Sequence, residues 1–171
     1  KNVMGAANMG TQIHEDLQNQ VEGRPTSGKW DDHIAPVIEW IKEKGLKFLE
    51  TEHTFVDPVH GFGGTIDGVA TNDDGAKLII DYKSRNSNPR YKMKPYEKEL
   101  AQVGAYSCGF YGVDAVLNGE VQGVNVLISR NEPGKMEICG YPPEKVIEGW
   151  KLFEALLTVW RMVRKYDPRK N

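Results

Sequence analysis

The sequence predicts an α/β protein with a mixed central sheet flanked by helices. Apolar residues recur with helical spacing near both ends of the chain and in its middle. Between these stretches lie short alternating or wholly apolar runs bounded by glycine, proline and asparagine, which is typical of strands. A length of 171 residues suits one domain with its own core, so we expect a single domain over residues 1–171.

The first half of the chain is expected to form two helices and then three strands. The helices are predicted over residues 6–21, where Ala6, Met9, Ile13 and Leu17 form an apolar stripe, and over 30–44, before Gly45. The strands are predicted at about 46–56, 64–72 and 76–83. The third strand is nearly all apolar, so we expect it at the centre of the sheet, covered on both faces.

The second half is expected to alternate loop, helix, strand pair and helix. Residues 84–95 are polar with two prolines, which predicts a mobile loop, and a helix follows over 96–110. Strands at 121–129 and 135–139 are expected around a turn at residues 131–134. Pro142 and Pro143 open a last helix that runs to about Tyr166, with one apolar stripe along it.

The most informative stretch runs from Gly64 to Lys83 and predicts a hairpin that brings two acids together. Residues 73–75 suit a three-residue loop with Gly75 in the left-handed conformation, so that Asn72 pairs with Ala76. Counting back along both strands puts Asp67 opposite Asp81. Side chains alternate along a strand, so Lys83 lies on the same face as Asp81.

This pair of acids predicts a metal site. Facing carboxylates repel each other unless a cation lies between them, and Mg²⁺ or Mn²⁺ is the natural occupant. An ammonium group at Lys83 beside the ion suits an anionic substrate.

Three further side chains are candidates for the same site. His14 borders the buried stripe of the first helix, where a neutral imidazole is a candidate third metal ligand. Taken alone, a histidine in this place is more often a hydrogen-bonded residue at the edge of a core. Gln102 and Tyr106 are spaced i,i+4 and share one helix face, although such residues by themselves more often pack or face solvent. Glu15 and Glu52 are weaker acid candidates.

Basic residues gather directly after the acid pair. Those we expect to contact nucleic acid are Arg85, Arg90, Lys92 and Lys94, with Tyr91 and Tyr96 between them. Lysine and arginine suit a phosphate backbone and tyrosine suits base stacking, whereas the plainer interpretation is a solvated loop. A second basic cluster over residues 161–170 is more typical of a frayed terminus.

Composition excludes several classes of protein. No run approaches the eighteen or so apolar residues of a membrane span, and the first ten residues lack the apolar core of a signal peptide. A net charge of −2 argues against a general nucleic-acid coat but leaves room for a local basic groove. Cys108 and Cys139 are too few and too far apart for a zinc site or a disulfide framework, so we expect an intracellular location, in a bacterial or phage-infected cell.

Four motifs in order resemble the RecB-type branch of the PD-(D/E)XK nuclease superfamily. The segments GTQIHEDL, GGTIDGV, IIDYKS and AQVGAY match that branch's G-x-x-x-H helix, G-x-x-D strand, D-x-K strand and Q-x-x-x-Y helix. The matching residues are Gly10 and His14, Gly64 and Asp67, Asp81 and Lys83, and Gln102 and Tyr106. The match spans roughly residues 10–106, and the remainder is similar to exonucleases of phages and of mitochondrial genome maintenance. Ile66 replaces the proline of the superfamily name, as is usual in this branch, and the four cysteines of its iron–sulfur relatives are missing.

The resemblance implies an αβββαβ core, a Mg²⁺- or Mn²⁺-dependent deoxyribonuclease and a role for each matching residue. Asp67 and Asp81 would hold the metal with His14 and the backbone carbonyl of Tyr82. Lys83 would orient the attacking water or stabilise charge on the phosphate, while Gln102 and Tyr106 would position the DNA. The resemblance favours an exonuclease on single-stranded or frayed ends that serves DNA repair, recombination or replication and leaves a 5′-phosphate.

Three alternatives remain open at this point. One is an endonuclease with the same site, since the two modes differ in loops that cap the groove. Another is a non-catalytic nucleic-acid-binding module of the same fold. The third is a phosphatase or nucleotide hydrolase, although the glycine-rich stretch at 61–64 lacks the spacing of a phosphate-binding loop. Oligomeric state is open as well.

Overall fold

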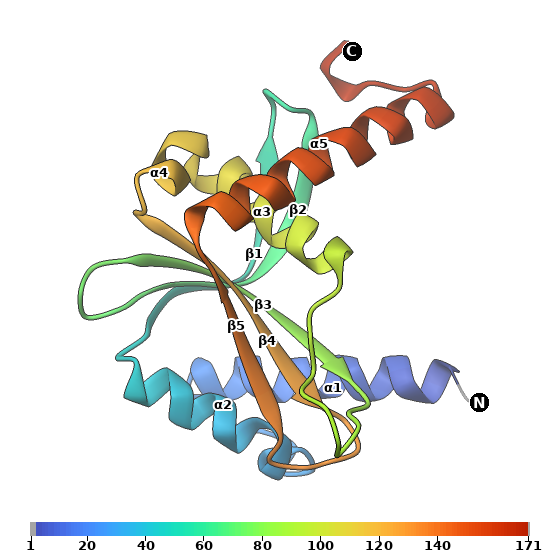
Figure 1. Cartoon of the computed structure of the whole chain (residues 1–171). Coiled ribbons are helices and arrows are strands. Elements are labelled where there is room, and N and C mark those ends of the chain that lie inside the picture. The colour runs from blue at the N-terminus through green and yellow to red at the C-terminus, as the bar shows by residue number, and fades with distance from the viewer. Residues whose placement is uncertain (1–2, 171) are drawn as a thin grey trace.

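The computed structural model describes residues 3–170, with side chains from residue 8, and contains a five-stranded sheet between two layers of helices (Figure 1). The elements in chain order are α1 (Val3–Val21), α2 (Asp31–Glu43), β1 (Lys47–Asp57), β2 (Phe62–Thr71), β3 (Lys77–Arg85), α3 (Glu97–Tyr111), α4 (Val113–Leu117), β4 (Val121–Ser129), β5 (Met136–Tyr141), α5 (Pro143–Arg164) and η1 (Pro168–Lys170). The predicted α/β class with a mixed, helix-flanked sheet is confirmed.

The strands lie in the sheet in their chain order, β1-β2-β3-β4-β5. Neighbours pair antiparallel except β3 and β4, which are parallel. A parallel pair needs a crossover, and α3 and α4 supply it. Strand β3 is therefore central, and Leu78 to Tyr82 are all buried, as its apolar sequence predicts.

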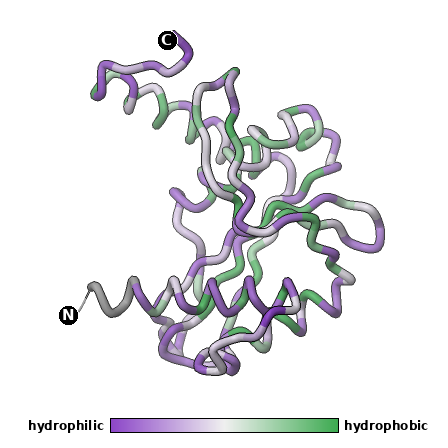
Figure 2. Tube along the Cα trace, turned by 180° about the vertical axis from the view of Figure 1, so that it is seen from behind, coloured by the Kyte–Doolittle hydropathy of each residue, from purple (hydrophilic) through white to green (hydrophobic). Residues whose placement is uncertain are grey.

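The two faces of the sheet carry different cores. Helices α1 and α2 cover one face with an aliphatic cluster that includes Ile13, Leu17 and Ile80, and α3 and α5 cover the other face. That second core is rich in aromatic rings, among them Phe55 and Trp150. Seen from behind, the central strands are mostly hydrophobic and the outlying turns hydrophilic (Figure 2). Of the predicted stripe on α1, Met9, Ile13 and Leu17 pack in the first core, and the Ala6 side chain lies outside the described residues.

The predicted β2–β3 hairpin is confirmed in its register. The Asn72 N–H donates to the Ala76 carbonyl at 3.1 Å, and Gly75 has a φ of 81°, which favours glycine. Paired residues run from Thr71↔Lys77 to Gly68↔Ile80, so the next position along the strands holds Asp67 and Asp81.

Helices α3 and α5 cross at two glycines. A Cβ on Gly104 would lie 2.3 Å from the Trp150 nitrogen, and one on Gly149 would lie 2.3 Å from the Leu100 oxygen. Only hydrogen atoms fit between these backbones, so the crossing fixes where α3 lies over the sheet.

The structure differs from the sequence-based expectation in two places. The short helix α4, which was not predicted, lies between α3 and β4, where five residues are too few for a clear period. Helix α5 has the predicted bounds but not a fully buried stripe. Val146 and Trp150 are buried, whereas Trp160 is 44% exposed because the outer half of α5 extends beyond the sheet (Figure 1).

Among the described residues, no helix is long and apolar enough to cross a membrane.

Candidate active site

The candidate site lies where the β2–β3 hairpin stops pairing through its backbone. Beyond Gly68 and Ile80, the Tyr82 N–H donates to the Asp67 carboxylate at 2.6 Å. A side chain thus takes the place of a strand carbonyl as acceptor. Backbone pairing thus ends at Gly68 and Ile80, and Asp67 and Asp81 occupy the next position on the two strands.

Asp81 is the most enclosed acid of the site. Its side chain is fully buried, and its Oδ1 accepts a hydrogen bond from the Lys83 Nζ at 2.6 Å. Its Oδ2 accepts another from the Asn125 Nδ2 at 2.7 Å. The Lys83 side chain keeps a quarter of its surface exposed, so its ammonium group lies between the buried acid and solvent. The predicted grouping of Asp81 with Lys83 on one face is confirmed.

The electrostatics of the two acids suit a cation. Burial raises the pKa of Asp67, and the nearby Asp81 charge raises it further. Burial also raises the pKa of Asp81, against the opposing effect of Lys83. One ammonium group therefore does not fully compensate the charges of the two carboxylates. Carboxylate oxygens are the ligands that Mg²⁺ and Mn²⁺ prefer, so this donor set fits such an ion.

Glu52 adds a third negative charge from strand β1. It lies between the paired residues Thr51↔Gly68 and His53↔Ile66, opposite Asp67, and it has a φ of 47°. Its charge also raises the pKa of Asp67. The glutamate is exposed, so it borders the mouth of the site rather than its interior.

His14 reaches the same end of β3 from the opposite face of the sheet. Its ring meets that of Tyr82 edge-on at 6.1 Å, and its buried Nε2 has no hydrogen-bond partner. Burial, and then the charge of Lys83, lower the pKa of His14 to about 4, so the imidazole is neutral at pH 7. A buried ring nitrogen without a partner is rare and is the atom that would bind a metal.

The metal-ligand set remains a prediction. Within residues 8–170, no three His, Cys, Asp or Glu side chains lie close enough together to enclose an ion, so His14 does not join the acid pair in one group. His14 instead lines a cavity of about 280 Å³ with Tyr82, Lys83 and Arg130. The role of the Tyr82 carbonyl as a metal ligand likewise stays a prediction.

Gln102 and Tyr106 lie beside the acids on helix α3. The Gln102 Nε2 donates to the Tyr106 hydroxyl at 2.9 Å. Asp81 and Asp67 both contribute to raising the pKa of Tyr106, after burial, which places its hydroxyl near the pair. A Cβ on Gly64 would lie 2.7 Å from the Tyr106 ring, so the glycine of the G-x-x-D motif makes room for this tyrosine.

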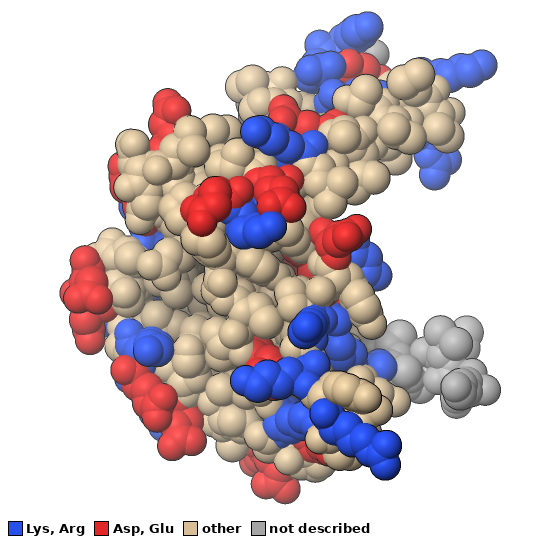
Figure 3. Space-filling model, in the orientation of Figure 1, with Lys and Arg blue, Asp and Glu red and all other residues tan. Residues whose placement is uncertain are grey.

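The basic segment between β3 and α3 divides into exposed and internal residues. Arg90, Lys92 and Lys94 are exposed, and Figure 3 shows lysines and arginines gathered on this side of the molecule. Buried Met93 anchors the segment. A hydrogen bond from Lys135 to the Asn88 carbonyl ties the segment to the β4–β5 turn at 3.0 Å.

Arg85 has a second role that the sequence did not indicate. Its guanidinium pairs with buried Glu99, donates to the Lys94 carbonyl at 2.9 Å and stacks on the Tyr96 ring. Arg85 therefore holds the basic segment and the start of α3 together, and its contact with nucleic acid stays a prediction.

Two residues of the site escaped the sequence analysis. Asn125 on β4 bonds Asp81, and the Tyr141 hydroxyl on β5 donates to Asn125 at 2.7 Å. A signal for Asn125 was present, since it lies between apolar residues in the middle of strand β4, Val121–Ser129. No comparable signal marks Tyr141.

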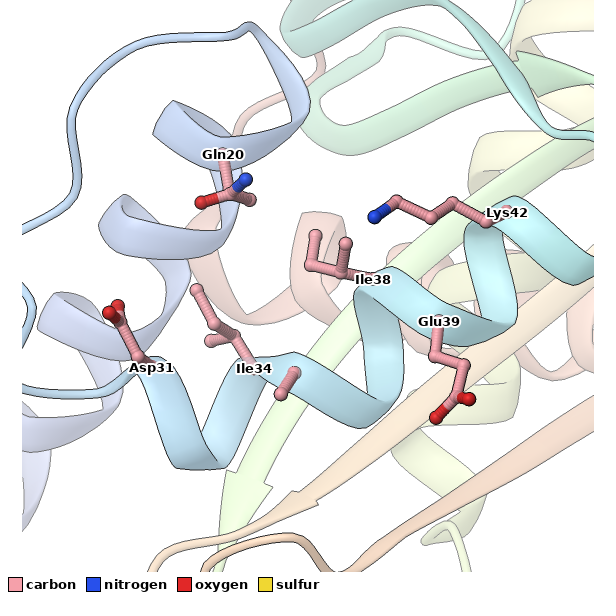
Figure 4. Close-up of a pocket in the computed structure, with 7 residues that line it drawn as sticks. Gln20, Asp31, Ile34, Ile38, Glu39 and Lys42 are labelled. Atoms are coloured by element: carbon pink, nitrogen blue, oxygen red, sulfur yellow. The ribbon is translucent and has the colours of Figure 1, made fainter.

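A separate groove lies between α1 and α2 (Figure 4). It has a volume of about 490 Å³ and is lined by Gln20, Asp31, Ile34, Ile38, Glu39 and Lys42, among others. None of the predicted site residues lines it, and its acids and lysine give it no single charge.

Similarity to known proteins is slight. The sequence matches no protein-family profile and no curated protein. Among solved structures, the crystal structure of SSO0001 is similar at 18% identity with a TM-score of 0.39, over 72% of this chain and 57% of that one. The chain thus spans less than two thirds of that protein, and a likeness at this level carries no argument about function.

Proposed function

We propose that this protein is a Mg²⁺- or Mn²⁺-dependent nuclease that cleaves phosphodiester bonds of DNA. One observation carries the proposal. Two carboxylates, Asp67 and Asp81, and the Lys83 ammonium converge where a hairpin stops pairing, with Gln102 and Tyr106 beside them. Two acids suit a divalent ion, and the amine and amide suit the phosphate that such an ion activates.

The fold we infer is the PD-(D/E)XK core of the RecB-type branch. The order of elements from α1 through β1–β3, α3 and β4 contains an αβββαβ core with a mixed sheet. All four motifs lie on the kind of element that the branch uses, with His14 on α1, Asp67 on β2, Asp81 and Lys83 on β3, and Gln102 and Tyr106 on α3.

In the proposed mechanism, Asp67 and Asp81 would hold the metal, with His14 and the Tyr82 carbonyl as the further ligands that the resemblance implies. A bound ion would polarise the scissile phosphate and lower the pKa of a water molecule. Lys83, held by Asp81, orients that water or neutralises charge that builds on the phosphate. Gln102 and Tyr106 position the strand, and Arg90, Lys92 and Lys94 bind its backbone.

We further propose an exonuclease mode on single-stranded or frayed ends. Resemblance of the second half of the chain to exonucleases supports this mode, and the exposed basic segment offers a path for one strand. An endonuclease would use the same acids and lysine.

The test is a gel time course on DNA labelled at one end. Linear single strands, linear duplex and a closed single-stranded circle are each incubated with magnesium, manganese or EDTA. Lys83→Ala is the inactive variant. Lys77→Ala is its matched control, since Lys77 lies at the turn end of the same strand, where it contacts Glu120 at 3.5 Å and the Tyr111 ring.

Metal-dependent loss of linear DNA that spares the circle, and that Lys83→Ala abolishes, would support the exonuclease. Cutting of the circle would change the mode to endonuclease. Hydrolysis of mononucleotides without any cleavage of DNA would replace the nuclease with a nucleotide hydrolase. DNA binding without cleavage under any condition would replace it with a binding module.

A further inference from the structure

A continuous line of hydrogen bonds leads from strand β5 through β4 to Asp81 on β3. Asn125 lies beside Asp81 in the parallel β3–β4 register, so both side chains lie on the same face of the sheet. Asn125 pairs with Cys139 on β5, and Tyr141 is two residues further on, which returns it to that face. Three neighbouring strands thus place the side chains of Asp81, Asn125 and Tyr141 next to one another on one face of the sheet.

Each group in this line has one role. The Tyr141 hydroxyl donates to the Asn125 Oδ1 at 2.7 Å, and the Asn125 Nδ2 donates to the Asp81 Oδ2 at 2.7 Å. A carboxylate only accepts, so the amide must turn its nitrogen to Asp81 and its oxygen to the tyrosine. Asn125 is fully buried, so its amide group is shielded from solvent. The tyrosine therefore fixes the amide, and the amide fixes the carboxylate.

The consequence lies at the other carboxylate oxygen. With Oδ2 held by Asn125, Oδ1 is the oxygen that faces Lys83, at 2.6 Å. Rotation of the Asp81 side chain would break its hydrogen bond to Asn125. The buried Asn125 amide would then lack a partner, which costs free energy. Asp81 therefore presents one oxygen to the site in a fixed direction.

We propose that Asn125 and Tyr141 are positioning residues that set the affinity of the site for its divalent cation by fixing the Asp81 carboxylate. This inference rests on the proposed function, because it concerns the same cation. Partners that orient a metal ligand commonly change metal affinity by about 10–100-fold when they are removed.

The test measures cation binding apart from catalysis. Isothermal titration with MnCl₂ at neutral pH compares the wild type with Tyr141→Phe and Asn125→Leu, and thermal unfolding in EDTA verifies that each variant is folded. Tyr111→Phe is the matched control, since Tyr111 packs against the same core without joining the hydrogen-bonded line. A metal titration of the cleavage rate completes the set.

We expect Asn125→Leu to lower Mn²⁺ affinity about 10–100-fold and Tyr141→Phe to lower it less, because Asn125 keeps its bond to Asp81. Raising Mn²⁺ should restore the rate of Tyr141→Phe, and DNA binding in EDTA should not change. Tyr111→Phe should match the wild type.

Two results would overturn the inference. Only the second of them would also overturn the proposed nuclease function. Wild-type Mn²⁺ affinity in folded Tyr141→Phe would remove the role of Tyr141 and leave the nuclease standing. Should Asn125→Leu fail to fold, Tyr141→Phe alone decides. A wild-type protein that binds no Mn²⁺ and cleaves no DNA would remove the proposed function together with this inference.

Discussion

The two faces of the central sheet differ in the hydrogen bonding of the polar groups that lie at the end of strand β3. On the α3–α5 face, Asp81 and Lys83 are bonded to each other, and Asn125 completes the acid's contacts. On the α1–α2 face, His14 buries a ring nitrogen that has no partner. The α3–α5 face thus carries polar groups bonded to each other, while the α1–α2 face carries a buried ring nitrogen without a hydrogen-bond partner.

The packing of the two faces differs in the same way. Helix α3 is held against α5 with backbone touching backbone at Gly104 and Gly149. Helix α1 meets β3 where a Cβ on Gly10 would lie 2.7 Å from the Ser84 hydroxyl, the movable end of a side chain. The α3–α5 face therefore tolerates added side-chain atoms at its glycines less well than the α1–α2 face does.

The largest expected effect is on catalysis at the α3–α5 face, where Asp81 and Lys83 are hydrogen-bonded. Lys83→Ala should lower the rate of DNA cleavage by about a thousandfold or more, because it removes the cation beside the reacting phosphate. Metal-dependent cleavage is measured on end-labelled DNA, with the melting temperature as a check on folding. Turnover equal to that of Lys77→Ala would contradict the assignment of Lys83.

The helix crossing should give the largest effect on stability. Gly149→Ala forces a methyl group against the Leu100 carbonyl, and we expect the free energy of unfolding to fall by about 2–3 kcal/mol or more. Urea denaturation measures it. Gly140→Ala on β5 is the control, since a Cβ there meets nothing within 4 Å. Equal stabilities of the two variants would mean that the crossing is looser than described.

The pH dependence of folding should report the buried imidazole on the other face. The pKa of His14 is lowered from 6.5 to about 4, so the folded protein binds fewer protons than the unfolded chain between these values. Stability from this group is complete above pH 6.5 and is lost as the pH falls toward 4, by about 3 kcal/mol. In EDTA, His14→Gln should lose correspondingly less stability between pH 7 and pH 4. Parallel curves for variant and wild type would exclude this titration.

The smallest effect should be on metal affinity through His14. His14→Ala should raise the metal concentration for half-maximal cleavage about tenfold, because one ligand is lost while both carboxylates remain. A titration with Mg²⁺ and Mn²⁺ measures this, with His60→Ala as the control, since His60 pairs with Asp57 away from the acids. An unchanged midpoint would make His14 a residue of the core edge.

Much of the fold and of the site was predictable because their signals are local. Turn chemistry at residues 73–75 sets the hairpin register, and register alone puts Asp67 opposite Asp81. The spacing of Gln102 and Tyr106 by one helical turn likewise predicts that their side chains meet. By contrast, α4 and the buried ion pair of Arg85 with Glu99 were missed, because five residues show no period and a basic residue in a polar loop looks solvated.

The sequence by itself determined the helices and strands other than α4, and it determined the hairpin register. It also determined the identity of the acids, lysine, glutamine and tyrosine that gather on one side of the sheet. Tertiary structure alone decided that β4 lies beside β3 with β5 beyond it, and hence that Asn125 and Tyr141 reach Asp81. It also decided that α3 lies close enough to α5 for two glycines to touch, and that the outer half of α5 is left exposed. The reason is physical: periodicity and turn geometry act over a few residues, whereas contact between distant strands depends on how whole faces pack.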